Sequence, residues 1–177
     1  LKFDDVMNDQ RHVIFSQRKE ILKNKSIYEL LNDLLEKIIN RFIDKKVIIN
    51  KNPKNKSFNL KLKSLLEKET NDTEIERLIS LNHNEFKEAI KNKFLKKRKE
   101  RIDFLGEEQN VEIEKRIFIQ TLDMNWRSHL QYLEQLRQVI GLRSYGQKDP
   151  LTEYKKEAFH LFENLLEKIQ FEIVTIL

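Results

Sequence analysis

The 177-residue sequence contains no cysteine, only three glycines and only two prolines. Without cysteine the chain can form neither a disulfide nor a thiolate metal site. Because helix-forming residues predominate and the residues typical of turns are scarce, the composition favours an all-α fold. The longest apolar runs, such as Val47-Ile48-Ile49, are only a few residues long, whereas a membrane-spanning helix needs about 20 apolar residues.

Motifs of nucleotide and metal chemistry are also absent. The sequence has no glycine-rich phosphate-binding loop of the G-x-x-x-x-G-K-[ST] type, and its four histidines are far apart and lack the H-E-x-x-H spacing. We therefore expect this chain by itself to have no enzymatic activity, no bound cofactor and no catalytic metal. We expect no signal peptide, because the first residues are charged at once. The sequence begins with Leu1 rather than methionine, so we expect it to be a fragment of a longer protein.

Charge is abundant and slightly unbalanced. Charged residues make up 36% of the chain and hydrophobic residues 39%, with a net charge of +5, which permits an acidic partner such as nucleic acid or anionic lipid. The basic run Lys96–Lys99, followed by Arg101, could bind phosphate. Glu100 and Asp103 interrupt it, however, and no aromatic platform for stacking bases accompanies it. We therefore favour a solvated helix face for this run.

Apolar residues at three- and four-residue steps predict a series of helices. The first is predicted over residues 4–24, with a stripe of Phe3, Val6, Gln10, Ile14, Gln17 and Ile21. A second helix starts near Ser26, and the lysine- and asparagine-rich stretch 50–59, which contains Pro53, then breaks the pattern. A weaker helical region over 60–81 and a polar helix over 83–105 follow.

The strongest periodicity comes after Gly106 and surrounds one compact turn. Its two apolar stripes are Val111, Phe118, Leu122, Trp126, His129, Leu133, Leu136 and Ile140, and then Leu151, Tyr154, Ala158, Leu161, Leu165, Ile169, Ile173 and Ile176. Between them lies "GLRSYGQKDP". We expect Gly141 to end the first helix with a positive φ, Asp149 to cap the second helix, and Pro150 to occupy its first position.

These signals predict an antiparallel helical hairpin. Pairs such as Leu133 with Ala158 keep a nearly constant index sum, as facing residues of a hairpin must. The predicted hairpin core comprises Leu122, Trp126, Leu133, Leu136, Leu161, Leu165 and Ile169. We expect the Trp126 ring to pack near Leu161 and Leu165, and Trp126 with His129 to serve the core rather than bind a ligand.

Two further groups of residues have alternative interpretations. Asp4, Asp5 and Asp9 could form an acidic site, but an ordinary acidic helix start is favoured. At the predicted turn, Leu142 and Tyr145 lie too far from the hairpin core to reach it. We expect them to be exposed for a partner, with burial against a neighbouring domain as the alternative.

Two segments resemble the SecA family of bacterial motor ATPases. The stretch 121–169, "TLDMNWRSHLQYLEQLRQVIGLRSYGQKDPLTEYKKEAFHLFENLLEKI", resembles the family's C-terminal helical region, and "FDDVMNDQRHVIFSQRKEIL" resembles the start of its helical scaffold. The middle of the chain, residues 47–105, is similar only in position and helical character. The resemblance implies a helical scaffold over 1–46, a helical wing over 47–106, and the remaining scaffold with a two-helix finger over 107–177, whose tip is 141–149.

The resemblance also implies a role in moving preproteins through the SecYEG channel. ATP and Mg²⁺ would be bound by motor domains that this fragment lacks. In the fragment, Tyr145 would contact unfolded preprotein, with Leu142, Arg143 and Lys148 beside it near the channel. The implied location is the cytoplasm and the cytoplasmic face of the bacterial inner membrane, where anionic phospholipid is a further possible partner. Apolar stripes uncovered by the missing domains favour self-association.

One alternative belongs to a different class of protein. A free-standing basic helical domain that binds RNA or anionic membrane would use the cluster Lys91–Arg101. A purely structural coiled coil is a third interpretation, but the specific residues of the tip argue against it.

Overall fold

The computed structural model describes the chain except for residues 1, 50–54, 67–69 and 147–148. Within the described residues the fold is all-α, as the composition predicts, and contains no strand. None of the described helices combines the length and the apolar character that crossing a membrane would require. Contacts divide the chain into two compact units, which we call unit 1 (residues 1–25 and 115–169) and unit 2 (residues 26–114 and 170–177).

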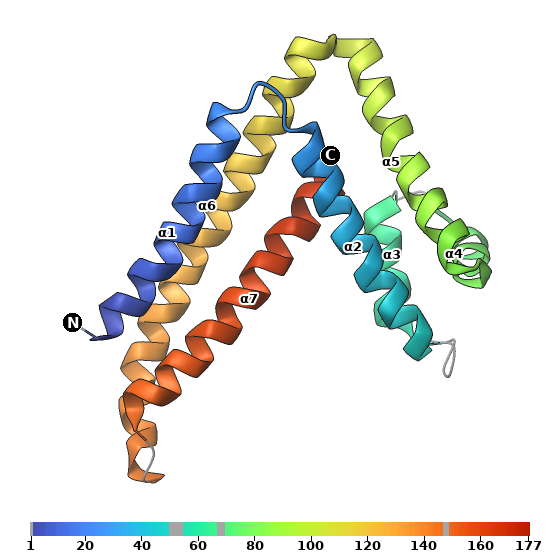
Figure 1. The fold of residues 1–177 in the computed structure, drawn as a ribbon. Helices are drawn as coiled ribbons and strands as arrows, with labels where there is room; N and C mark the ends of the chain where they lie inside the picture. The colour runs from blue at the N-terminus through green and yellow to red at the C-terminus, as the bar shows by residue number, and fades with distance from the viewer. Residues whose placement is uncertain (1, 50–54, 67–69, 147–148) are drawn as a thin grey trace. The chain divides into compact units, whose positions relative to one another are not determined.

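The helices match most of the predicted segments (Figure 1). They are α1 (Lys2–Lys23), α2 (Tyr28–Ile49), α3 (Lys56–Leu66), α4 (Asp72–Ser80), α5 (His83–Leu105), α6 (Glu107–Ile140), the 3-10 helix η1 (Gly141–Gly146) and α7 (Pro150–Ile176). The predicted limits of the helix over 83–105 are confirmed at both ends. The weaker helical region over 60–81 is instead two helices, α3 and α4.

The predicted break over 50–59 is too long at its C-terminal end. α3 already begins at Lys56, because the Asn55 side chain accepts a hydrogen bond from the Phe58 N–H (3.2 Å) and so satisfies a free donor of the first turn. Phe58 is buried against Phe42, and their rings meet edge-on with centroids 5.3 Å apart. Pro53 lies outside the described residues.

Unit 1 packs α1 against the hairpin formed by α6 and α7. Three contacts along α1 show that it runs antiparallel to α6: Asp4 with Arg137, Gln10 with His129, and Arg18 with Asp123. Figure 1 shows the two helices side by side. One core cluster comprises the buried residues Leu133, Ile140, Tyr154 and Ala158, with Phe3, Val6, Met7, Leu136 and Leu161 packed against it. The predicted partners Leu133 and Ala158 therefore share one core, which confirms this part of the hairpin register.

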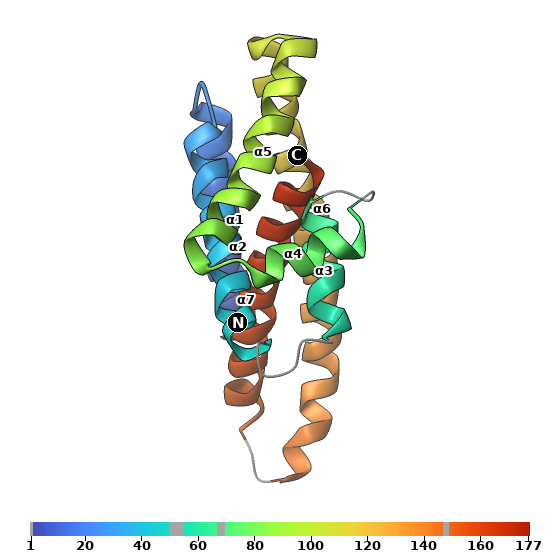
Figure 2. The same cartoon turned by 90° about the vertical axis from the view of Figure 1, so that its right-hand side faces the viewer.

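Unit 2 is built around α5. α2, α3 and α4 all pack against α5, and α4 lies beside its N-terminal end (Figure 2). The end of α7 adds the buried residues Ile173 and Val174 to this unit, and Leu177, which follows α7, is buried there as well. The predicted wing limits, near residues 47 and 106, both fall inside unit 2, so the wing as a separate domain stays a prediction.

The glycine predicted to adopt a positive φ is the wrong one. Gly141 does not have a positive φ and instead begins η1, in which the chain tightens into i→i+3 turns. Among the described glycines, Gly106 has the positive φ, at 85°, and it separates α5 from α6. The chain therefore changes direction abruptly at Gly106, whereas α6 continues into the tip.

Candidate functional site at the hairpin tip

The tip begins where the hairpin core ends. Ile140 is buried, whereas Leu142, two residues later, is 70% exposed. The backbone of Arg143 and Tyr145 belongs to η1, and Lys148 lies outside the described residues. The predicted tip is thus a short helical projection on a buried base, and the roles of its side chains stay predictions.

The return arm is capped as the sequence predicts. Pro150 is the first residue of α7, and an Asp149 carboxylate oxygen accepts hydrogen bonds from the Thr152 N–H (3.0 Å) and the Thr152 hydroxyl (2.6 Å). The hydroxyl first, and then the backbone N–H, lower the pKa of Asp149 below its ordinary value. The direction in which α7 leaves the tip is therefore fixed by local hydrogen bonds.

A buried polar contact joins all three helices of unit 1. The Gln10 Nε2 donates to the Ala158 carbonyl (3.0 Å), so the Gln10 Oε1 faces the His129 Nε2 at 2.7 Å. An amide oxygen can only accept, so the His129 Nε2 carries a proton. The imidazole lies between the rings of Trp126 and Phe162, with centroids 5.6 and 5.8 Å away. Trp126 and His129 are both buried, as the sequence predicts.

The other predicted core positions differ in burial. Leu122, Leu133, Leu165 and Ile169 are buried, while Leu136 and Leu161 are half-buried. Phe162, which stands next to Leu161 and contacts His129, is not among the predicted core residues. Gln10 lies on the predicted apolar stripe of the first helix, and this position in the repeat is the sequence signal of its burial.

The free energy of unfolding is expected to depend on pH through His129. Burial lowers its pKa from 6.5 to about 4, so the unfolded chain binds this proton more tightly than the folded chain does. Stability is therefore lost as the pH falls from 6.5 toward about 4. Between about pH 7.5 and about pH 5 we expect a loss of about 2 kcal/mol from this residue.

Urea denaturation at both pH values, followed by circular dichroism, measures this loss. His129→Gln is expected to remove that part of the pH dependence, whereas His160→Gln is the matched control, because His160 is exposed. Equal pH dependence in the unmodified chain and in His129→Gln would contradict the assignment.

The acidic residues of α1 lie at an ordinary helix start. Asp4 and Asp5 are in the first turn of α1, where the positive end of the helix dipole favours a carboxylate. Asp4 also pairs with Arg137 (3.1 Å), and Asp5 and Asp9 are exposed. This arrangement favours the structural interpretation of the three aspartates.

The basic run of α5 is only in part the solvated face predicted for it: Lys96 and Lys99 are exposed, but the arginines of the run are not. Arg98 and Arg101 have side chains only 13% and 19% exposed, and both pair with Glu114, which is fully buried on α6. Lys97 Nζ donates to the Leu66 carbonyl, which ends α3. These internal partners weaken the alternative of a phosphate-binding face. Glu114 was missed, although it stands three residues after Val111 and four before Phe118 on the predicted stripe.

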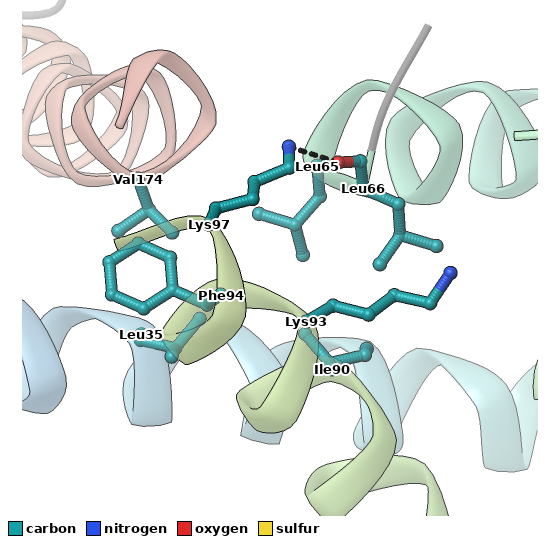
Figure 3. A pocket seen from close by; sticks show the side chains of 8 residues that line it. All are labelled: Leu35, Leu65, Leu66, Ile90, Lys93, Phe94, Lys97 and Val174. Atoms are coloured by element: carbon teal, nitrogen blue, oxygen red, sulfur yellow. Dashed lines mark hydrogen bonds between the residues drawn. The ribbon is translucent and has the colours of Figure 1, made fainter. Parts of the chain in front are cut away.

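A small cavity lies beside Lys97 in unit 2 (Figure 3). Its lining is mainly apolar and comprises Leu35, Leu65, Leu66, Ile90, Lys93, Phe94, Lys97 and Val174. With a volume of about 10 Å³ it has room for one water molecule at most. The cavity is therefore a packing defect between helices and not a site for an organic ligand.

Comparison with known proteins identifies the family. The model of the SecA wing and scaffold domain matches residues 1–177. The protein translocase subunit SecA of Pelagibacter ubique (strain HTCC1062) is 55% identical over 177 residues, which are 100% of this chain and 21% of that protein. The same subunit of Hyphomonas neptunium (strain ATCC 15444) is 36% identical, covering 96% of this chain and 19% of that protein. The chain thus spans about a fifth of the length of these curated relatives, and it belongs to the SecA wing and scaffold domain family.

Proposed function

We propose that this chain is the scaffold and wing part of a SecA motor, which uses ATP to drive preproteins through the SecYEG channel. The observation that carries the proposal is the match of the whole chain to the SecA wing and scaffold domain, together with two relatives named protein translocase subunit SecA. In this proposal the hairpin is the two-helix finger, and its tip contacts the channel and the unfolded preprotein.

The build of unit 1 supports a mechanical role for the hairpin. The side chain of Gln10 links α1 to both arms through buried hydrogen bonds, and Asp149 fixes the start of the return arm. A projection whose base is held by three helices moves as a rigid body, because buried polar contacts are costly to break. A displacement of the scaffold would therefore be transmitted to the tip.

The proposed division of labour leaves the chemistry to other domains. ATP and Mg²⁺ would be bound by motor domains beyond this chain, which lacks a phosphate-binding loop in its sequence. The proposed location is the cytoplasm and the cytoplasmic face of the bacterial inner membrane, with anionic phospholipid as a further partner. The isolated chain is expected to self-associate through apolar surface that the motor domains would cover.

Purified alone, the chain is expected to release no phosphate from ATP above the rate of a buffer control. Phosphate release by a preparation free of the full-length motor is the measurement. Turnover that rises in proportion to the amount of chain and survives repeated purification would contradict the proposed division.

Replacing Tyr145 tests the tip in the complete motor. Tyr145→Ala is expected to reduce preprotein transport strongly while leaving helicity and basal ATPase nearly unchanged. We expect the Tyr145 side chain to lie outside the hairpin core, and surface changes usually alter stability by at most about 0.5 kcal/mol. Tyr145→Phe is expected to be milder because it retains the apolar ring.

The measurement is transport at matched concentrations of motor and channel. Tyr132→Ala is the matched control, because Tyr132 is 62% exposed on α6 and lies outside the tip. Transport at the unmodified rate by Tyr145→Ala would show that the tip aromatic is not a working contact. Loss of helicity in the same variant would show that the residue is structural instead.

A further inference from the structure

We propose that Gly106 is a hinge between α5 and α6, and that Arg98, Arg101, Asn110 and Glu114 form an ionic clasp that holds this hinge in one position. All five residues belong to unit 2. The device goes beyond the proposed transport function, because it concerns how the angle between two helices of this chain is set and released.

The backbone at Gly106 supports the hinge. Its φ of 85° and ψ of 156° lie in a region that is essentially restricted to glycine. Its N–H donates to the Ile102 carbonyl (2.7 Å), and its own carbonyl accepts from the Asn110 N–H (3.0 Å). α5 therefore ends and α6 begins at a single residue. A Cβ added here would have no atom within 4 Å, so packing does not require glycine, but the backbone conformation does.

The clasp is placed symmetrically about this glycine. Arg98 stands eight residues before Gly106 and Glu114 eight residues after it, while Arg101 and Asn110 stand five before and four after. Glu114 Oε1 accepts from Arg98 Nε (2.8 Å), Arg101 Nη2 (2.9 Å) and Asn110 Nδ2 (3.0 Å), and its Oε2 accepts from Arg98 Nη2 (3.2 Å). The contact with Asn110 lies within α6, whereas the three contacts with Arg98 and Arg101 join α6 to α5 and form only when the two helices meet at this angle.

The clasp also reaches two other elements of unit 2. Arg101 Nη1 donates to the Leu177 carbonyl, which follows the end of α7, and the Arg98 guanidinium lies over the Tyr28 ring at 4.6 Å. A helix C-terminus and an aromatic face both favour a cation. These contacts help to offset the charge of the second arginine, because one buried carboxylate cannot neutralise two guanidinium groups.

Contact between α5 and α6 depends on the negative charge of Glu114, because this carboxylate is shared by two guanidinium groups. If its negative charge is removed, two guanidinium groups remain against a buried, neutral side chain, which is unfavourable at low dielectric. Moving α5 away from α6 lets both groups reach water, and the glycine backbone allows that movement. Because α2, α3 and α4 pack on α5, such a movement would carry them with it, as hinge motions carry packed elements.

Spin labels test the hinge in this chain directly. The sequence has no cysteine, so Lys96→Cys and Glu112→Cys, both at exposed positions, give one labelled site on each helix. We expect a single narrow distance distribution. Glu114→Gln is expected to add a longer distance, while Glu108→Gln, the same charge change at an exposed position on α6, should leave the distribution unchanged.

Gly106→Ala is expected to lengthen the distance as well, because alanine disfavours the observed backbone conformation. The longest distance is expected if α5 and α6 join into one continuous helix, in which the two labelled positions lie about 24 Å apart along the axis. An unchanged distribution in Gly106→Ala would overturn the hinge, and an unchanged distribution in folded Glu114→Gln would overturn the clasp. If Glu114→Gln loses its helicity, Arg98→Lys decides instead, because lysine retains the charge but loses the two-pronged contact. A longer distance in Arg98→Lys supports the clasp, and no change overturns it.

Discussion

Trp126→Ala is expected to lower the free energy of unfolding by about 3–5 kcal/mol. The indole is only 7% exposed, and its ring lies beside His129, which in turn contacts Phe162 of α7 and Gln10 of α1. Removing it leaves a void at the point where all three helices of unit 1 meet. The surrounding side chains are held by hydrogen bonds and ring contacts, so they can collapse into that void only in part.

Urea denaturation followed by circular dichroism measures this loss, since the substitution removes the only tryptophan and with it the usual fluorescence signal. Tyr132→Ala removes a large aromatic side chain from an exposed position of the same helix and is expected to cost at most about 0.5 kcal/mol. Similar losses in the two variants would mean that the Trp126 ring contributes little to the core.

The hairpin could be predicted from the sequence because its signals are local. Apolar residues at helical spacing define the buried stripes, and Asp149 followed by Pro150 marks the start of the second arm through hydrogen bonds between near neighbours. The limits of α5 were predictable for the same reason: Asn82 and Glu85 form a capping box at one end, and Gly106 stands at the other.

The backbone conformation at the glycines and the division of residues 60–81 could not be predicted from local sequence patterns. A glycine after a helix permits either a left-handed stop or a helical continuation: Gly141 begins η1, whereas Gly106 has a positive φ. The division of residues 60–81 into α3 and α4 was not predictable from a weak stripe. The limits of the predicted wing and the contacts of Tyr145 at the tip rest on the family resemblance and stay predictions.

The burial of Arg98 and Arg101 does not follow from the local sequence pattern. A run of lysines and arginines normally predicts a solvated helix face, yet Arg98 and Arg101 turn inward to Glu114. Their burial depends on a carboxylate from another helix, which follows a glycine turn. Hydrophobic periodicity places Glu114 on the buried stripe, but it does not predict which arginines pair with this carboxylate.

Glu114→Ala is accordingly expected to cost about 3–5 kcal/mol in the free energy of unfolding, because it leaves two cations without their shared partner. Asn110, which is fully buried, also loses a hydrogen bond in this variant. Glu108→Ala at an exposed position of the same helix is the control and is expected to stay within about 0.5 kcal/mol. A loss in Glu114→Ala no larger than in this control would contradict the assigned burial.

Replacing the whole clasp by apolar residues is expected to cost less than Glu114→Ala alone. In the combined variant Arg98→Met, Arg101→Met, Asn110→Leu and Glu114→Leu, no charge remains to be desolvated, and buried ion pairs often exchange for apolar side chains with little loss. The Leu177 carbonyl loses its contact with Arg101, which adds about 1 kcal/mol. If the combined variant is instead less stable than Glu114→Ala, the clasp stabilises the fold in its own right. If it is the more stable of the two but the label distance between α5 and α6 becomes broad, the clasp serves to fix the helix angle rather than to hold the fold together.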